Sequence, residues 1–245
     1  GLVGDGDFFR EEYKRREINA CHFDCFCDFD GDGDLDLFKG GVESFIYCYE
    51  NVGSNRFVER GRLTSAGVPF DLPRGSNNRS WVSVEFFDWD RDGDQDLFAS
   101  FQDGPYSGQV VFFENITASR GRLTFADRGP VRTLSGKALF QGGWFAAPTL
   151  LTDWDGDGDG KVDMLMGTNN RCYLHRNVRR TSDGGLIVDE PVAIQAGDSE
   201  IVLSNPRFDC ADIDGDGDRE LFGGSQPGPI TVSYTHLTLP TIYSV

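Results

Sequence analysis

Apolar and acidic positions alternate along this chain in a pattern that recurs about every 60 residues. Four acidic stretches begin at Asp28, Asp88, Asp153 and Asp212, so consecutive starts lie 60, 65 and 59 residues apart. Each stretch leads into a short apolar segment, which reads DLFKGG, DLFAS, DMLMG or ELFGG. A solvated acidic run has no reason to recur or to end in this way. The pattern therefore indicates an internal repeat.

Three further apolar segments complete each repeat. The first ends in Asn51, Asn115 or Asn177; the next reads RFVER, LTFADR or LIVDEP; the last reads WVSVEFFD, APTLLTD or PRFDCAD and leads into the next acidic stretch. These segments are rich in Phe, Tyr, Val and Leu, with Gly, Asn, Asp and Pro between them, which is typical of β-strands. The sequence predicts an all-β fold, a β-propeller of four-stranded blades with about four repeats.

The chain shows little helical periodicity. Residues 11–17, EEYKRRE, fit one exposed helical turn or a charged loop equally well. The repeat is longer than the ~40–50 residues of common propeller blades, so we expect long surface loops between the strands.

The acidic stretches have the residue spacing of a divalent-cation loop. In D-x-D-x-D-G-x-x-D, alternate side chains turn inward, the glycine allows the bend, and the last aspartate begins the next strand. Calcium takes about 6–8 oxygen ligands from carboxylates, carbonyls and water, so we expect about four Ca²⁺ sites. The candidate ligands are Asp28, Asp30, Asp32, Asp34 and Asp36; Asp88, Asp90, Asp92, Asp94 and Asp96; Asp155, Asp157, Asp159 and Asp163; and Asp212, Asp214, Asp216, Asp218 and Glu220.

The third loop has two additional residues, which leaves its register open. Counting back from Asp163 preserves all four ligand positions, and we prefer that register to one counted forward from Asp153. Position 7 of this loop is Lys161, where the other loops have aspartate. Because lysine can occupy position 7, a backbone carbonyl rather than the side chain is favoured as the ligand there.

Other calcium loops fit the sequence less well. An EF-hand needs a glutamate at position 12 and flanking helices, whereas position 12 is Lys39, Ala99, Met166 or Gly223 and the flanks are strand-like. Tandem nonapeptide repeats would be spaced much more closely than these loops.

The four loops and their following strands resemble the FG-GAP and VCBS family of calcium-binding propeller repeats. The resemblance covers residues 1–231 and implies blades like those of integrin α-chain heads and many secreted bacterial proteins. It implies that GLVGDGDFF at the start is the end of a preceding blade and that GGSQPGPI, residues 223–230, begins an incomplete one. We therefore expect an arc of a larger ring, with exposed strand edges.

Residues 232–245 are considered separately from the repeats. VSYTHLTLPT, residues 232–241, resembles translated sequencing-adapter sequence. We expect the segment to be non-native and leave it out of the fold prediction.

The net charge of −17 argues against nucleic acid as a partner. Twenty of the 40 acidic residues lie in the four stretches, so the acidity belongs to the predicted sites. No apolar run approaches the ~20 residues of a membrane span.

The cysteines and tryptophans fit structural roles. Cys21, Cys25 and Cys27 share parity on one strand, where disulfide geometry is poor; buried thiols are the preferred interpretation and the redox compartment stays open. Trp89 and Trp154 each follow the first aspartate of a loop. We favour packing for the tryptophans, with sugar stacking as the alternative.

The sequence contains few candidate catalytic residues. His22 and His175 precede the tail, and the sequence has no GxSxG, P-loop or HExxH motif. We expect a non-catalytic, calcium-binding module, extracellular or at the cell surface, that binds a protein or glycan through loops on the propeller face. Two alternatives are the propeller part of a secreted polysaccharide lyase or hydrolase, and a spacer within a larger surface protein.

Overall fold

A computed structural model describes fourteen stretches of the chain. They are residues 24–40, 44–54, 56–73, 82–101, 104–118, 122–139, 149–152, 154, 161–168, 171–196, 199–202, 207–212, 220–224 and 230–233. Regular structure in these stretches consists of strands, with no helix among them. None of the described residues therefore forms a helix long and apolar enough to cross a bilayer. The predicted all-β class is confirmed.

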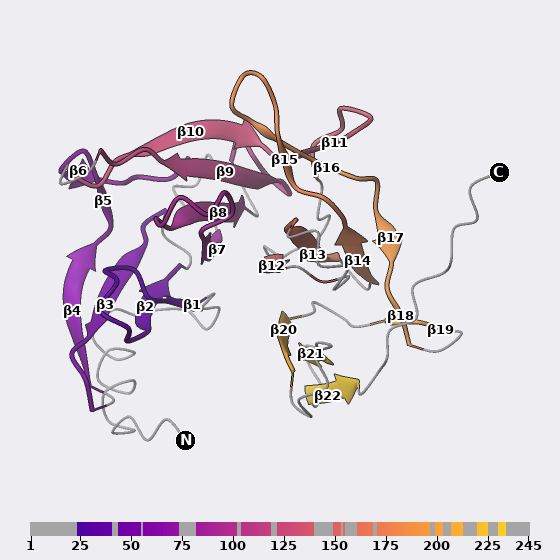
Figure 1. The fold of residues 1–245 in the computed structure, drawn as a ribbon, viewed down its shortest axis with the longest axis horizontal. Helices are drawn as coiled ribbons and strands as arrows, with labels where there is room; N and C mark the ends of the chain where they lie inside the picture. Colours follow the sequence, from indigo (N-terminus) through magenta and orange to yellow (C-terminus); the bar gives the residue numbers. More distant parts are fainter. Residues whose placement is uncertain are drawn as a thin grey trace. The chain divides into compact units, whose positions relative to one another are not determined.

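The first two repeats each form a four-stranded sheet (Figure 1). The first has the order β1-β2-β3-β4, with antiparallel neighbours. The second has the order β10-β9-β8-β7. Their strands are β1 (Asp24–Cys27), β2 (Asp36–Lys39), β3 (Tyr47–Asn51) and β4 (Phe57–Arg62), and β7 (Val82–Phe87), β8 (Asp96–Phe101), β9 (Val110–Asn115) and β10 (Phe125–Pro130). The strands β2, β3, β7 and β9 lie within apolar segments that the sequence predicts, and β4, β8 and β10 extend one or two residues past such segments.

The third and fourth repeats follow the same plan. The third sheet has the order β12-β13-β14-β17, and the described part of the fourth has the order β20-β21-β22. These strands are β12 (Thr149–Thr152), β13 (Asp163–Thr168), β14 (Arg171–His175), β17 (Val192–Ala193), β20 (Arg207–Ala211), β21 (Glu220–Gly224) and β22 (Ile230–Ser233). The predicted four-stranded blade is thus present in three repeats. Closure of the blades into a ring stays a prediction.

The third repeat corrects one detail of the predicted pattern. The LIVDEP segment was expected to supply its fourth strand, but β17 pairs with β14 instead. The LIV residues form β16 (Leu186–Val188), which pairs with β15 (Arg179–Arg180) and, in parallel, with β11 (Arg132–Thr133). A tight turn closes β15 onto β16, with a hydrogen bond of 2.9 Å from Thr181 N to Gly185 O. This hairpin occupies the backbone groups of β16, so the next extended segment completes the blade.

Short hairpins lie between the blades along the chain. They are β5 (Thr64–Ser65) with β6 (Val68–Pro69), and β18 (Gln195–Ala196) with β19 (Ser199–Glu200). The strand β22 ends at Ser233, so its last two residues lie in the predicted non-native tail, which begins at residue 232, and residues 234–245 lie outside the described part. The predicted tail boundary stays a prediction.

The chain forms two compact units. The first comprises Gly1–Ser107 with Phe113–Asp127, and the second Gly108–Phe112 with Arg128–Val245.

Aromatic rings form the core between the first two blades in the first unit. The ring centroids of Phe29, Phe38 and Phe86 lie 4.4–5.4 Å apart, in tilted or edge-to-face contact. Such pairs add about 0.5–1.5 kcal/mol beyond their buried area. Phe86 N–H also donates to Cys25 Sγ at 3.4 Å, which joins β7 to β1. These contacts hold the loops that precede β2 and β8 on a packed base.

A separate apolar cluster lies in the second unit. It contains Leu165, Cys172, Leu174, Ile194 and Leu221, with Trp154 and Ile201 packed against it. The preferred packing role is therefore confirmed for Trp154. Trp81 and Trp144 lie outside the described residues.

Candidate metal centres

All four acidic loops occupy the same place in their sheets, between the first and second strands. The closing acid of each loop is the first residue of the second strand and pairs with the last residue of the first strand. The four pairs are Cys27 with Asp36, Phe87 with Asp96, Thr152 with Asp163, and Ala211 with Glu220. The prediction that position 9 begins the next strand is therefore confirmed in every loop.

Backbone amides hold the carboxylates of the first loop. Asp28 accepts hydrogen bonds from Gly31 N at 2.9 Å and Gly33 N at 3.1 Å. Asp32 N donates to Asp30 at 3.2 Å, and Asp34 N donates to Asp32 at 2.9 Å. Gly33 has a φ of 92°, which a side-chain-bearing residue rarely adopts. The loop therefore needs glycine at the position where the sequence places the bend.

The second loop repeats this arrangement. Asp88 accepts hydrogen bonds from Asp92 N and Gly93 N, both at 3.1 Å, and Asp94 N donates to Asp92 at 3.1 Å. Gly93 has a φ of 95°. Two loops 60 residues apart thus adopt the same turn because they share the same aspartate and glycine positions.

The first three aspartates of both loops converge. One carboxylate oxygen from each of Asp28, Asp30 and Asp32 lies within 4.8 Å of the other two, and the same holds for Asp88, Asp90 and Asp92. Oxygens bound to one Ca²⁺ at about 2.4 Å lie at most about 4.8 Å apart. The prediction that alternate side chains turn toward a common centre is confirmed geometrically in these loops.

The closing acids are buried beside these clusters. Asp36, Asp96, Asp163 and Glu220 are between 2% and 8% exposed. Asp96 Oδ2 and Asp94 Oδ1 are buried and have no hydrogen-bond partner among the described residues. Buried polar atoms are normally satisfied. Two unsatisfied carboxylate oxygens beside three converging aspartates are donors suited to a bound cation.

The electrostatics of the second loop reflect this crowding. Burial, together with the charges of Asp90, Asp94 and Asp92, raises the pKa of Asp96 to about 8, against the opposing effect of the hydrogen bond from Asn115. Burial and the charges of Asp92, Asp90 and Asp88 raise the pKa of Asp94 to about 6. Burial also raises the pKa of Asp36. Without a counter-charge, these loops hold their carboxylates at an energetic cost.

An asparagine at the end of the third strand, or two residues after it in the third blade, contacts each of three closing aspartates. Asn51 N donates to Asp36 Oδ1 at 2.9 Å, Asn115 N to Asp96 Oδ1 at 2.8 Å, and Asn177 N to Asp163 Oδ1 at 2.9 Å. Sequence analysis identified the recurring asparagine but assigned it no role. The constant place of the asparagine before the turn is a signal for this role, but the aspartate that it contacts lies 14–19 residues away along the chain.

The asparagine side chains also bind the loop. Asn51 Nδ2 donates to Leu35 O at 3.2 Å, and Asn115 Nδ2 donates to Gln95 O at 3.2 Å. Leu35 and Gln95 each immediately precede the closing acid. In the third blade the amide instead reaches Asp189 Oδ2, at 2.8 Å.

The third loop is described only at its ends. Trp154 N donates to Asp163 Oδ2 at 3.1 Å, and the amide of Phe29 makes the equivalent contact with Asp36. Trp154 therefore occupies the place of Phe29 on the entry side, and Asp163 the place of Asp36 on the exit side. The two additional residues lie between these ends, so the preferred register of the ligands inside the loop stays a prediction.

Six of the predicted ligands cannot be placed. Asp155, Asp157, Asp159, Asp214, Asp216 and Asp218 lie outside the described residues. In the fourth loop, Asp212 and Glu220 are described at its two ends; Asp212 is exposed and Glu220 is 8% exposed.

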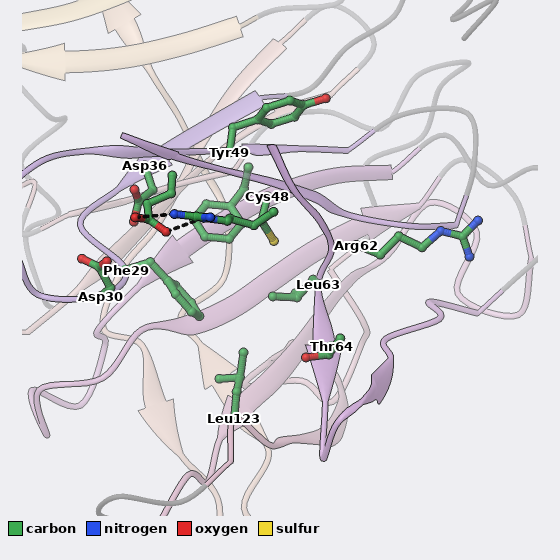
Figure 2. A pocket seen from close by; sticks show the side chains of 12 residues that line it. Phe29, Asp30, Asp36, Cys48, Tyr49, Arg62, Leu63, Thr64 and Leu123 are labelled. Carbon is green, nitrogen blue, oxygen red and sulfur yellow. Dashed lines mark hydrogen bonds and ion pairs between the residues drawn. The ribbon is translucent and has the colours of Figure 1, made fainter. Parts of the chain in front are cut away.

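A pocket of about 290 Å³ lies beside the first loop. Figure 2 shows Phe29, Asp30 and Asp36 together at one end of it, while the Arg62 side chain extends away from that end. An ion pair between Arg60 and Glu50, with an N–O distance of 2.7 Å, lies on its wall. Both side chains are partly exposed, so the pair contributes little to stability. The pocket is close to the lower size limit of small-molecule sites.

Three of the cysteines and His175 are buried. Cys25, Cys27 and Cys172 are buried thiols outside any disulfide, which confirms the preferred interpretation for these cysteines. His175 is 2% exposed and its Nδ1 lies 3.2 Å from Asp189 O. Cys21 and His22 lie outside the described residues.

Comparison with known proteins identifies one part of the chain. Residues 28–99 match the model of the FG-GAP-like repeat family. The match runs from the first aspartate of the first loop into β8, so it contains the first and second acidic loops. The predicted resemblance is confirmed for this segment. No curated protein matches the chain.

Solved structures give more distant matches. A lectin of Agrocybe aegerita that recognises non-reducing terminal N-acetylglucosamine is 15% identical, with a TM-score of 0.39, over 84% of this chain and 61% of the lectin chain. The crystal structure of TcdB2-TccC3-TEV is 16% identical, with a TM-score of 0.38, over 88% of this chain and 11% of the other. The chain thus spans less than two thirds of either protein.

Proposed function

We propose that this chain, whose residues 28–99 match an FG-GAP-like repeat, is a calcium-binding, non-catalytic β-propeller module that binds a protein or glycan outside the cell. The observation that carries the proposal is the arrangement of the second loop. There, Asp88, Asp90 and Asp92 converge within 4.8 Å, next to a buried and unsatisfied oxygen of Asp96.

The donor set supports calcium over other metals. The converging side chains are all carboxylates, and oxygen donors suit hard cations, whereas zinc and copper sites usually include nitrogen or sulfur. Mg²⁺ is bound through one or two carboxylates and keeps several waters. A loop that offers four or five carboxylates and backbone carbonyls is better matched to the larger coordination shell of Ca²⁺.

The bound ion would act mainly on stability. Asp88, Asp90, Asp92 and Asp94 crowd one turn, and a divalent cation removes their repulsion. With ~2 mM Ca²⁺ and a Kd of ~0.1 mM, one site adds roughly 1.8 kcal/mol. Extracellular calcium is abundant enough to fill sites of this strength, which is the main support for a location outside the cell.

The local environment of His175 supports a non-catalytic role. The imidazole is buried and contacts a backbone carbonyl, so it is poorly placed to exchange protons with a substrate. The pocket beside the first loop offers a ligand a contact surface next to the metal loop. In this proposal calcium holds the loops and the loops contact the partner.

The test is thermal unfolding of the full chain in 2 mM CaCl₂ and in excess EGTA. A contribution of 1.8 kcal/mol corresponds to a melting temperature higher by about 4–7 °C for each occupied site in a chain of this size. Titration with 2 mM MgCl₂ serves as the control and should give a smaller shift. Identical melting curves in calcium and EGTA would refute the calcium function.

The binding function needs its own measurement. Calcium-loaded protein should bind a specific glycan on an array or a specific protein in solution, and EGTA should weaken that binding because the loops lose their conformation. Turnover of a polysaccharide with release of new chain ends would instead establish the enzyme alternative.

A further inference from the structure

The asparagine that ends the third strand makes more contacts than strand pairing requires. Asn115 is 8% exposed and forms several hydrogen bonds in and beside the second loop. Its backbone N donates to Asp96 Oδ1 at 2.8 Å, its Nδ2 donates to Gln95 O at 3.2 Å, and its Oδ1 accepts from Thr117 N at 3.2 Å. Both hydrogen-bonding atoms of the amide are therefore in use.

The two oxygens of the Asp96 carboxylate have different surroundings. Oδ1 is occupied by the Asn115 amide, whereas Oδ2 is buried without a hydrogen-bond partner in the described structure. Because one oxygen is held from outside the loop, the carboxylate cannot rotate freely, and the second oxygen keeps its place near Asp90, Asp92 and Asp94.

The same arrangement recurs in the first loop. Asn51 N donates to Asp36 Oδ1, Asn51 Nδ2 donates to Leu35 O, and Asn51 Oδ1 accepts from Gly53 N at 3.1 Å. The residue after the asparagine differs between the loops, Val52 in one and Ile116 in the other, but the three bonds are preserved. Strand pairing does not require these side-chain bonds, so their presence at both loops points to a role in the loops.

We propose that Asn115 and Asn51 are positioning residues of the metal loops: the backbone N–H orients the closing aspartate toward the cation, and the side-chain amide fixes the backbone carbonyl directly before it. The inference rests on the proposed calcium function and extends it to residues outside the acidic motif. Partners that orient a metal ligand typically change affinity by about 10–100-fold when they are removed.

The first test is terbium luminescence of the full chain, titrated for the unchanged protein and for Asn115→Ala, Asn115→Asp and Asp96→Asn. Trp89 lies between Asp88 and Asp90 and serves as the sensitiser. The signal lost in Asp96→Asn identifies the second loop. We expect Asn115→Ala to raise the Kd of that component about tenfold.

Asn115→Asp separates positioning from charge. This variant is nearly isosteric and keeps the acceptor for Thr117 N, but it loses the donor to Gln95 O and adds a negative charge. If charge alone governed the site, the variant would bind the cation more tightly than the unchanged protein. We expect weaker binding, because the side-chain bond that fixes the Gln95 carbonyl, directly before the closing aspartate, is lost, although the backbone N–H still donates to Asp96 Oδ1.

The melting temperature in EGTA separates positioning from folding. A purely structural role would lower this temperature in Asn115→Ala and leave the terbium Kd unchanged, which would overturn the proposal. If Asn115→Ala does not fold, the equivalent variant Asn51→Ala tests the first loop by calcium titration calorimetry. Absence of terbium and calcium binding by the unchanged protein would overturn the proposed function itself, and the positioning role with it.

Discussion

At the scale of single residues, the closing acid of the second loop combines burial with incomplete hydrogen bonding. Asp96 is 2% exposed, and one of its oxygens has no hydrogen-bond partner within the described residues. A buried carboxylate of this kind is costly unless a positive charge is present. In the proposed calcium function, Asp96 destabilises the cation-free protein and stabilises the protein once a cation is bound.

We expect Asp96→Asn to change stability in opposite directions with and without calcium. In EGTA the variant should be more stable by about 1–2 kcal/mol, because a buried and repelled charge is removed. The calcium-induced rise in melting temperature should shrink by the contribution of one site. Differential scanning fluorimetry measures both, with Asp183→Asn, which lies outside the acidic loops, as a control that should leave the response to calcium unchanged. A variant less stable than the unchanged protein in EGTA would contradict this account.

His175 predicts a pH dependence that is independent of the metal. Burial lowers its pKa, and the carbonyl of Asp189 and the charge of Glu190 oppose that effect less strongly. The unfolded chain therefore binds a proton near pH 6.5, while the folded chain resists it. The contribution of His175 is present above about pH 6.5 and is lost as the pH falls toward its folded pKa.

The measurement is urea unfolding in EGTA at pH 7.5 and pH 5.0, for the unchanged protein and for His175→Asn. The acidic loops titrate in both proteins, so the difference between the two isolates the histidine. We expect the loss of stability at pH 5.0 to be smaller in the variant. Equal pH dependence would show that protonation of His175 is not coupled to unfolding.

At the scale of elements, the second loop is connected to the segment between β9 and β10. Thr117 accepts a hydrogen bond from Thr124 N at 3.0 Å and donates to Asn115 Oδ1. Phe125 N in turn donates to Ser65 at 2.9 Å, and Ala66 N donates to Leu123 O at 2.7 Å. A chain of hydrogen bonds thus joins the metal loop of the second blade to the β5–β6 hairpin.

We expect Thr117→Val to destabilise the protein by about 1–2 kcal/mol, because it leaves Thr124 N without its acceptor while preserving side-chain shape. Thr124→Val is the matched control. Its hydroxyl donates to Arg122 O at an exposed site, so a smaller loss is expected. Thermal unfolding measures both variants, and an equal or larger effect of the control would argue against the proposed connection.

At the scale of the whole molecule, the charge is concentrated in the loops. Twenty of the 40 acidic residues lie in the four stretches, and the net charge is −17. Four bound Ca²⁺ ions would change the net charge to −9. Solubility and mobility in an electric field should therefore depend on calcium as well as on pH.

Native mass spectrometry should show about four calcium ions bound to the full chain. The double variant Asp36→Asn with Asp96→Asn should bind about two, because each substitution neutralises a closing acid of one loop. Mobility in a native gel with and without EGTA provides an independent measure of the charge change. Binding of fewer than two ions by the unchanged protein would contradict the expected equivalence of the loops.

The sequence by itself determined the strand-forming segments, the four loops and the position of the closing acids. These features are local: side-chain alternation, glycine at the bend and the spacing of aspartates act within about ten residues, so they can be read along the chain. The convergence of Asp28 with Asp30 and Asp32 follows from the same local turn.

Only the tertiary structure decided which distant groups meet. The pairing of Asn115 with Asp96, the ring contacts of Phe29 with Phe86, and the choice of β17 over β16 as a blade strand all join residues far apart in sequence. Each depends on competition among several possible partners for backbone groups or apolar surface. Spacing along the chain does not resolve that competition, because it is settled when the strands pack together.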